Sequence, residues 1–214
     1  KSTYARMIQK MVKDENRNNL IIDDVRKTLT EGRSPIVLTN LTTHVETLAN
    51  ALAPYCKYVV TLIGSESARE KHQKMELLQG ISPTEPLVIV ATGKYVGEGF
   101  DYPRLDTLFL ALPVSWKGII AQYAGRLHRE YPGKKEVRIY DYIDIRIPMC
   151  DVMYKRRLRG YASVGYQIKS NEPMNIFNES HSVIFNGHTY LGKFFNDLSQ
   201  AKRSVVISAT KLWF

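Results

Sequence analysis

Five short apolar, β-branched runs recur along the chain and alternate with longer stretches of mixed polar and apolar residues. Runs of this kind are typical of buried strands, and the stretches between them have the periodicity of amphipathic helices. Strands that alternate with helices imply right-handed crossovers and a mostly parallel sheet covered on both faces. The sequence therefore predicts an α/β domain of three layers. The expected strands are 35–39, 58–63, 87–91, 106–112 and 136–142, and the expected helices are 3–31, 43–53, 67–79, 116–128 and 148–160.

Composition narrows the class of protein. Of the 214 residues, 44% are hydrophobic, but no apolar run approaches the roughly 18 residues that a membrane-spanning helix needs. No signal-peptide pattern opens the chain. The two cysteines, Cys56 and Cys150, lie far apart without paired ligands nearby, which predicts a reducing compartment and no metal site. The formal net charge of +9 favours a polyanionic partner. We therefore expect a cytoplasmic protein that binds no membrane.

The run QYAGRLHR, from Gln122 to Arg129, carries two arginines three residues apart and a glutamine four residues before the first. Residues at these spacings share one face of a helix, so Gln122, Arg126 and Arg129 are expected to point the same way. Two guanidinium groups held together can bind a terminal phosphate and neutralise the charge that develops on it. The alternative to a phosphate site is a solvent-exposed basic helix face whose arginines form ion pairs.

The upstream run LVIVATGKYVGEGFD, Leu87 to Asp101, reads as a buried parallel strand that ends at Thr92 and enters a loop rich in glycine. Open α/β sheets bind ligands at the carboxyl ends of their strands, where glycines let backbone amides approach phosphates. Asp101 could accept hydrogen bonds from a ribose. An ordinary strand-to-helix connection with turn glycines is the alternative for this segment taken alone.

Together the two runs resemble motifs V and VI of DEAD/DEAH-like helicases of superfamily 2. A third run, PIVLTNLTTHVETLA from Pro35 to Ala49, resembles motif IV: a strand, Thr39 and Asn40 at its end, then a helix opened by a capping box of Thr43 and Glu46. The resemblance covers about residues 3 to 168. The resemblance is strongest to bacterial helicases in which a sequence like EYPGKKEVRIYDYID, Glu130 to Asp144 here, follows motif VI. It implies a RecA-like fold.

The resemblance also implies roles for individual residues. Arg129 would be the arginine finger that reaches a nucleotide on another domain, Arg126 its partner on the phosphates, and Gln122 the polar residue that links them. Several relatives carry arginine at the position of Glu98, so this glutamate could instead pair with Arg126 or Arg129. His128 is the one histidine expected near the chemistry. The residues that would face the nucleotide are Gly97, Glu98, Gly99 and Asp101, and those that would grip a nucleic-acid backbone are Thr39, Asn40, Thr92, Gly93 and Lys94.

Two motifs of such helicases are missing. The chain has no GxxxxGK[ST] phosphate loop and no Asp-Glu-x-Asp or Asp-Glu-x-His run, and Asp14-Glu15 lacks the apolar strand that would precede it. In the family these parts belong to the first of two RecA-like domains. The resemblance therefore implies the second motor domain alone, which would hydrolyse ATP poorly by itself. The preceding domain would hold most of the ATP and Mg²⁺, and the partner would be nucleic acid, DNA in preference to RNA, in a bacterial cytoplasm.

The chain divides, on this view, into a helical lead-in (1–32), the RecA-like domain (33–168), a linker (169–180) and a further segment (181–214). The last segment resembles the start of a phospholipase D-like domain, although the His-x-Lys signature of that family is absent. Two alternatives stay open: a partial α/β extension that packs on the helicase domain, and a binding module that targets a phospholipase D-like nuclease. The basic run YKRRLR, Tyr154 to Arg159, could grip nucleic acid or be a solvated helix face above a buried stripe of Met149, Val152, Met153 and Leu158.

Overall fold

The computed structural model describes residues 3–97, 100–114, 119–144, 147–163, 166–170 and 203–210. Its centre is a sheet in the strand order β2-β3-β1-β4-β5-β7-β6. The first five are parallel and match the five strands expected from the sequence. They are β1 (Pro35–Thr39), β2 (Tyr58–Leu62), β3 (Leu87–Thr92), β4 (Thr107–Leu110) and β5 (Glu136–Ile143).

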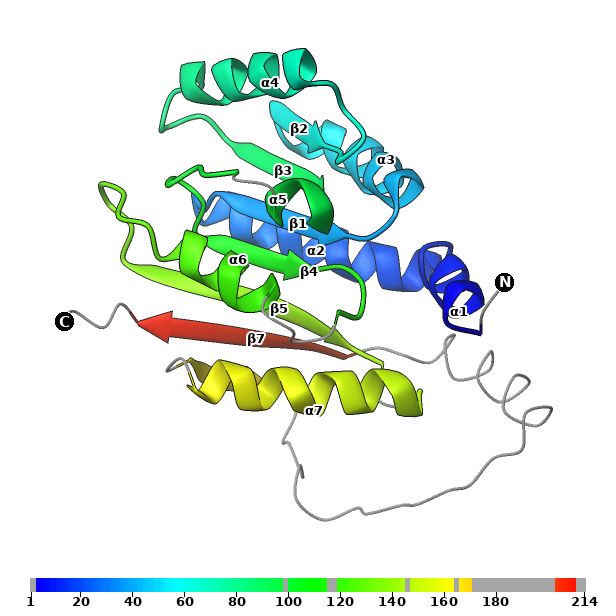
Figure 1. Ribbon diagram of the computed structural model, residues 1–214. Coiled ribbons are helices and arrows are strands. Elements are labelled where there is room, and N and C mark those ends of the chain that lie inside the picture. Colours follow the sequence, from blue (N-terminus) through cyan, green and yellow to red (C-terminus); the bar gives the residue numbers. More distant parts are fainter. Residues whose placement is uncertain are drawn as a thin grey trace.

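Helices cover both faces of this parallel sheet (Figure 1). Behind it lie α2 (Glu15–Thr30) and α3 (Thr42–Leu52), and in front lie α5 (Gly93–Gly97) and α6 (Ile119–Leu127). Alternate residues of each strand enter opposite cores: Val37 and Val90 pack toward α2 and α3, whereas Ile36 and Ile89 pack toward α6. The prediction of a three-layer α/β domain with a mostly parallel sheet is confirmed.

The remaining helices complete the layers. They are α1 (Thr3–Met11), α4 (Ala68–Gly80), α7 (Pro148–Ser163) and the short 3-10 helix η1 (Ala53–Tyr55). Asp14 caps α2 by accepting a hydrogen bond from the amide of Arg17, so the Asp14-Glu15 pair begins a helix and follows no strand. No described helix has both the length and the apolar character needed to cross a membrane.

Two local expectations about helices were wrong. The helix α3 begins after Leu41, which makes no side-chain cap, so Thr43 and Glu46 form no capping box. The capping box occurs instead at α4, between Ser67 and Glu70. In α7, Val152 is exposed and Met149, Met153 and Leu158 are only partly buried. The buried stripe consists of Cys150, Tyr154, Arg157 and Tyr161.

Arg157 is buried because it has a complete set of partners. Its guanidinium donates to both carboxylate oxygens of Asp141 on β5, at 2.6 and 2.8 Å, and to the carbonyl of Val114 at 2.8 Å. The hydroxyl of Tyr161 donates to the same carboxylate at 3.1 Å. This pairing fixes α7 against β5, so one of the four basic residues of YKRRLR belongs to the core, while Lys155, Arg156 and Arg159 are exposed.

Two antiparallel strands extend the parallel sheet beyond β5. The strand β7 (Arg203–Thr210) pairs with β5 along its whole length, and β6 (Gln167–Ser170) pairs with the other side of β7. The segment Ser204 to Ala209 thus lies in the same sheet as the five parallel strands, which agrees with the alternative of an extension that packs on that domain. The rest of 181–214, and most of the expected linker, lie outside the described residues, and the domain boundaries stay a prediction.

Candidate functional site

The sequence-predicted nucleic-acid residues come together at the carboxyl edge of the parallel sheet. Thr39 and Thr92 are register partners on the neighbouring strands β1 and β3. Asn40 follows β1 and is exposed, and Gly93 begins the short helix α5 directly after β3. Parallel strands end at one edge, so residues that are dozens of positions apart in sequence become neighbours here.

The motif V and motif VI segments touch at this edge. The hydroxyl of Tyr123 on α6 donates a hydrogen bond to the carbonyl oxygen of Gly93. Burial raises the pKa of this hydroxyl to about 12, so it stays a donor at neutral pH. A Cβ at residue 93 would lie 2.8 Å from the Tyr123 hydroxyl oxygen and 3.8 Å from Oδ1 of Asn40. Gly93 is therefore required by the close approach of motif VI, and Tyr123 was not among the expected site residues.

The side chain of Thr39 takes part in a buried hydrogen-bond chain. Its Oγ1 lies 2.8 Å from Nδ1 of His44, whose Nε2 lies 2.9 Å from Oδ1 of Asn18. Asn18 donates its Nδ2 to the carbonyl of Val12, so its Oδ1 must accept the proton of His44 Nε2. It follows that His44 Nδ1 accepts from the Thr39 hydroxyl. Burial, and then the charge of Arg17, lowers the pKa of His44 to about 3, so the imidazole is neutral.

The side chain of Thr92 is also engaged within the protein. Its hydroxyl oxygen accepts a hydrogen bond of 3.0 Å from the amide of Gly64, in the loop between β2 and α4. A Cβ at Gly64 would lie within 3.3 Å of the aliphatic part of Lys94, so this lysine packs over the same loop while its residue stays exposed. Of the five residues predicted to grip nucleic acid, Asn40 and Lys94 present exposed side chains.

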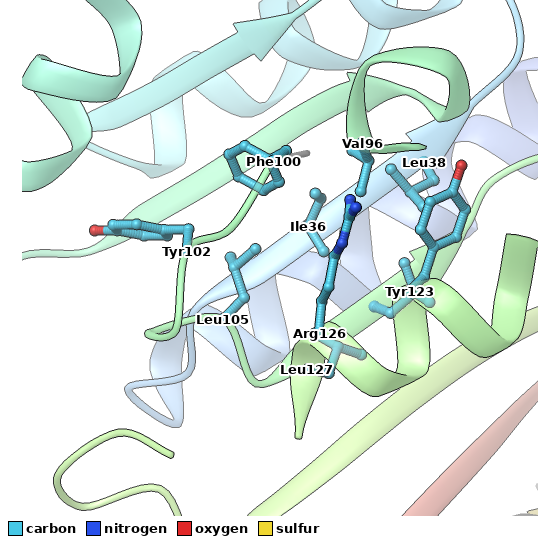
Figure 2. A pocket seen from close by; sticks show the side chains of 10 residues that line it. Ile36, Leu38, Val96, Phe100, Tyr102, Leu105, Tyr123, Arg126 and Leu127 are labelled. Carbon is cyan, nitrogen blue, oxygen red and sulfur yellow. The ribbon is translucent and has the colours of Figure 1, made fainter. Parts of the chain in front are cut away.

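Arg126 points into an apolar pocket beside α5 (Figure 2). Its guanidinium lies next to Val96 and Leu38, and the buried Nη1 has no hydrogen-bond partner among the described residues. A buried donor without a partner costs about 1 to 3 kcal/mol, so a ligand oxygen that reached it would be favoured. The pocket is lined by Ile36, Leu38, Val96, Phe100, Tyr102, Leu105, Leu108, Tyr123, Arg126 and Leu127.

Arg129 and Asp101 form an exposed ion pair. The Nε of Arg129 lies 3.7 Å from Oδ1 of Asp101, and the two side chains are 61% and 47% exposed. Exposed pairs of this length contribute at most about 1 kcal/mol, so Arg129 is held loosely. The helix α6 ends at Leu127, and Arg129 lies in the turn that follows. Gln122 is exposed, and Arg126 enters the pocket. Because Arg129 lies beyond the end of α6, the helix spacing does not fix its direction, and the expectation that all three side chains point the same way stays a prediction.

His128, between Arg126 and Arg129 in the sequence, contacts Tyr166. Its Nε2 lies 2.8 Å from the hydroxyl of Tyr166, and the two rings meet edge to face. The segment before β6 is thereby attached to the end of α6.

Lys134 is a residue of the site that the motifs did not single out. Its ammonium group donates to three backbone carbonyls, those of Pro103, Leu127 and Arg129. The turn that carries it has a clear signal in the sequence, the Pro-Gly pair of EYPGKK.

Some expected site residues cannot be placed. Glu98 and Gly99 lie outside the described residues, and Gly97 is the last residue of α5. No three His, Cys, Asp or Glu side chains within the described ranges are grouped so as to hold a metal ion.

Comparison with known proteins gives relatives at low identity. The chain is 26% identical over 139 residues to transcript termination protein A18 of fowlpox virus, which covers 64% of this chain and 29% of that protein. It is 27% identical over 192 residues to putative helicase 161L of invertebrate iridescent virus 6, covering 79% of this chain and 38% of that protein. The chain thus spans well under half the length of these relatives. No model of a known protein family matches it.

The crystal structure of T4 UvsW superposes with a TM-score of 0.50 at 22% identity, covering 61% of this chain and 26% of that one. The fold is RecA-like. The two curated relatives are viral proteins, so the expected bacterial origin finds no support in them.

Proposed function

We propose that this chain is the second motor domain of an ATP-dependent nucleic-acid helicase or translocase, and that Arg129 is its arginine finger. The observation that carries the proposal is the junction of motifs V and VI, where Arg129 meets Asp101 at 3.7 Å and Tyr123 bonds to Gly93. The helicase-like fold and the viral relative described as a putative helicase support it.

The exposure of Arg129 suits a finger. A guanidinium that is 61% exposed and held, among the described residues, by one long ion pair can exchange Asp101 for a phosphate that approaches from another domain. Arg126 would then supply its unpartnered Nη1 to the same phosphates, and the exposed Gln122 would link the two domains. Asp101, released from Arg129, and the glycines at 97 and 99 would face the nucleotide, with Glu98 beside them.

ATP and Mg²⁺ would be held mainly by a preceding RecA-like domain of the same protein. The groups of this chain that can bind the nucleotide are the guanidinium groups of Arg126 and Arg129, which would donate hydrogen bonds to its phosphates. When bound, Mg²⁺ would neutralise part of the charge of the phosphates. The two arginines of this chain would neutralise the charge that develops on the terminal phosphoryl group, and the isolated chain would hydrolyse ATP poorly.

The grip on nucleic acid would lie at the ends of β1 and β3. Because the Thr39 hydroxyl donates to His44 and the Thr92 side chain is buried, contacts to phosphate would fall to the exposed side chains of Asn40 and Lys94 and to the backbone around Gly93. Contacts to phosphate do not distinguish one base from another, so binding would be independent of the nucleic-acid sequence. The net charge of +9 suits such a partner, which we take to be DNA in preference to RNA.

The alternative, a binding module that targets a phospholipase D-like nuclease, is less well supported. It needs residues 181–214 to begin a separate domain, whereas Arg203–Thr210 forms a strand of the helicase-like sheet. A protein of this second kind would bind nucleic acid without ATP turnover.

The test is nucleic-acid-stimulated ATP hydrolysis by the full-length protein that contains this chain. We expect Arg129→Ala to lower kcat by about a hundredfold or more while nucleotide binding stays near normal. Arg69→Ala, an exposed arginine on α4 outside the site, is the matched control and should leave kcat unchanged. Equal turnover in Arg129→Ala and wild type would show that Arg129 is not an arginine finger. Absence of ATPase activity in the wild type would favour the nuclease-targeting alternative.

Binding of single-stranded DNA and RNA to the same proteins tests the grip. Affinity should fall steeply with salt, and Lys94→Ala should make that dependence shallower by about one phosphate contact. An unchanged salt dependence in Lys94→Ala would show that Lys94 does not contact the nucleic acid. Tighter binding of RNA than of DNA would contradict the expected preference for DNA.

A further inference from the structure

A tight turn directs Lys134 back toward the end of α6. The amide of Lys134 donates to the carbonyl of Tyr131 at 3.1 Å, which closes a four-residue turn. Pro132 and Gly133 occupy its two central positions, and Gly133 has a φ of 82°. Proline followed by a residue with positive φ is the signature of a type II turn. The local sequence therefore sets the direction from which the lysine side chain leaves the backbone.

The ammonium group of Lys134 joins two segments that are distant in sequence. It donates to the carbonyls of Leu127 and Arg129, each at 2.8 Å, and also to the carbonyl of Pro103. Leu127 is the last residue of α6, where a cation interacts favourably with the helix dipole and with carbonyls that lack a partner within the helix. An ammonium group has three donors on one compact centre, which suits three converging carbonyls.

The two segments are the ones that carry the Arg129–Asp101 ion pair. Pro103 follows Asp101 by two residues, and Arg129 itself supplies one of the three carbonyls. The ion pair is exposed and long, so it cannot by itself set the position of the guanidinium. The contacts of Lys134 to Pro103 and Leu127 are partly buried, the contact to Arg129 is exposed, and together they join the backbone segments that carry both partners of the ion pair.

We propose that Lys134 is a positioning residue for Arg129, which fixes the end of α6 and the loop after Asp101 relative to each other so that the finger reaches its phosphate. The inference rests on the function proposed above. A small displacement of a catalytic group lowers turnover steeply, by up to about a hundredfold for 1 Å. Loss of Lys134 should therefore lower kcat and leave substrate binding largely intact.

The experiment compares four forms of the full-length protein with wild type: Lys134→Met, Lys135→Met, Arg129→Ala and the double variant Lys134→Met/Arg129→Ala. Methionine keeps much of the length of the side chain and removes the donors. Lys135 is the adjacent exposed lysine and serves as the matched control. Lys134→Met is expected to lower kcat of the stimulated ATPase by about ten- to a hundredfold with little change in KM for ATP, whereas Lys135→Met should match wild type.

The double variant separates a positioning role from a general loss of structure. If Lys134 acts through Arg129, its removal costs nothing further once the arginine is gone, so the double variant should turn over as slowly as Arg129→Ala alone. Losses that multiply in the double variant, or wild-type kcat in Lys134→Met while Arg129→Ala is impaired, would overturn the role of Lys134 and leave the arginine finger standing. Wild-type turnover in Arg129→Ala would instead overturn the proposed function.

Hydrogen exchange supplies a second readout that does not depend on ATP hydrolysis. The backbone amides of 100–105 and of 127–131 should exchange faster in Lys134→Met than in Lys135→Met, because the two segments are no longer joined. Unchanged protection in both segments would show that the three carbonyl contacts do not hold them, and would overturn the inference.

Discussion

Tyr123 and Gly93 meet so closely that the hydroxyl of one occupies the place where a side chain of the other would begin. The contact joins α6 to the end of β3, and with it the two runs of sequence that first suggested a motor domain. The glycine thus serves the packing of one motif against the other.

Gly93→Ala is expected to lower the free energy of unfolding by about 1 to 3 kcal/mol, because the new methyl group must displace a buried ring. Tyr123→Phe removes the oxygen that lies 2.8 Å from that position and leaves the nearest ring carbon at 3.9 Å. Gly93→Ala should therefore cost less in the Tyr123→Phe background. Urea unfolding of the four proteins measures both costs, and equal values would show that the hydroxyl is not the obstacle.

Acid should weaken the fold through His44. The pKa of its imidazole is about 3 in the folded protein, against an ordinary value of 6.5. Between these values the unfolded chain binds a proton that the folded protein excludes, so this contribution to stability is complete above pH 6.5 and is lost as the pH falls toward 3. The slope approaches about 1.4 kcal/mol per pH unit.

The check is the unfolding free energy of wild type and His44→Gln from pH 7 to pH 4. The advantage of the wild type should narrow as the pH falls. A constant difference between wild type and His44→Gln would contradict the exclusion of the proton.

The adjacent arginines of α7 separate the two interpretations of its basic run. Arg157→Met should lower the free energy of unfolding by about 3 to 5 kcal/mol, because it leaves the buried carboxylate of Asp141 without its cation. Arg156→Met, at an exposed position, should leave stability within about 0.5 kcal/mol of wild type. Thermal unfolding measures both. If Arg156→Met also weakens binding of nucleic acid, the exposed part of the run contributes to the grip.

Gly133→Ala should destabilise the protein by about 1 to 2 kcal/mol, since a side chain is strained at a φ of 82° even where there is space for it. Gly80→Ala is the matched control, because that glycine also has open space around it but ends a helix without a positive φ. It should be neutral or slightly stabilising. Equal effects in denaturant unfolding would mean that the turn tolerates a change of conformation.

The parallel sheet was predictable because its central strands β1, β3 and β4 are short runs of residues buried on both faces, and such runs stand out in a sequence. The buried stripe of α7 was not. A prediction from apolar periodicity assigns arginine to the solvent-exposed face of a helix. Arg157 is buried because it pairs with the carboxylate of Asp141 on β5, and only the fold brings the two residues together. The same reasoning applies to β7, whose partners come from a distant strand.

In the site, the motifs assigned both Arg129 and Asp101 to the nucleotide, but they did not predict the ion pair between them. They also could not give the direction of Arg126, which depends on how α5 packs over α6. They also omitted His44 and Lys134, which act through buried hydrogen bonds and backbone carbonyls. Contacts of that kind do not correspond to any regular spacing of residues that could be recognised in a sequence.

The position of β7 between β5 and β6 has a consequence during synthesis of the protein. The five parallel strands are all available once Ile143 has been made, yet the strand that covers the open edge of β5 is made much later. In the interval that edge presents unpaired amides and carbonyls, to which another nascent chain can add. Pairing across such a long separation in sequence is also slow. The newly made domain is therefore most prone to aggregate late in its production, after its central sheet has already assembled.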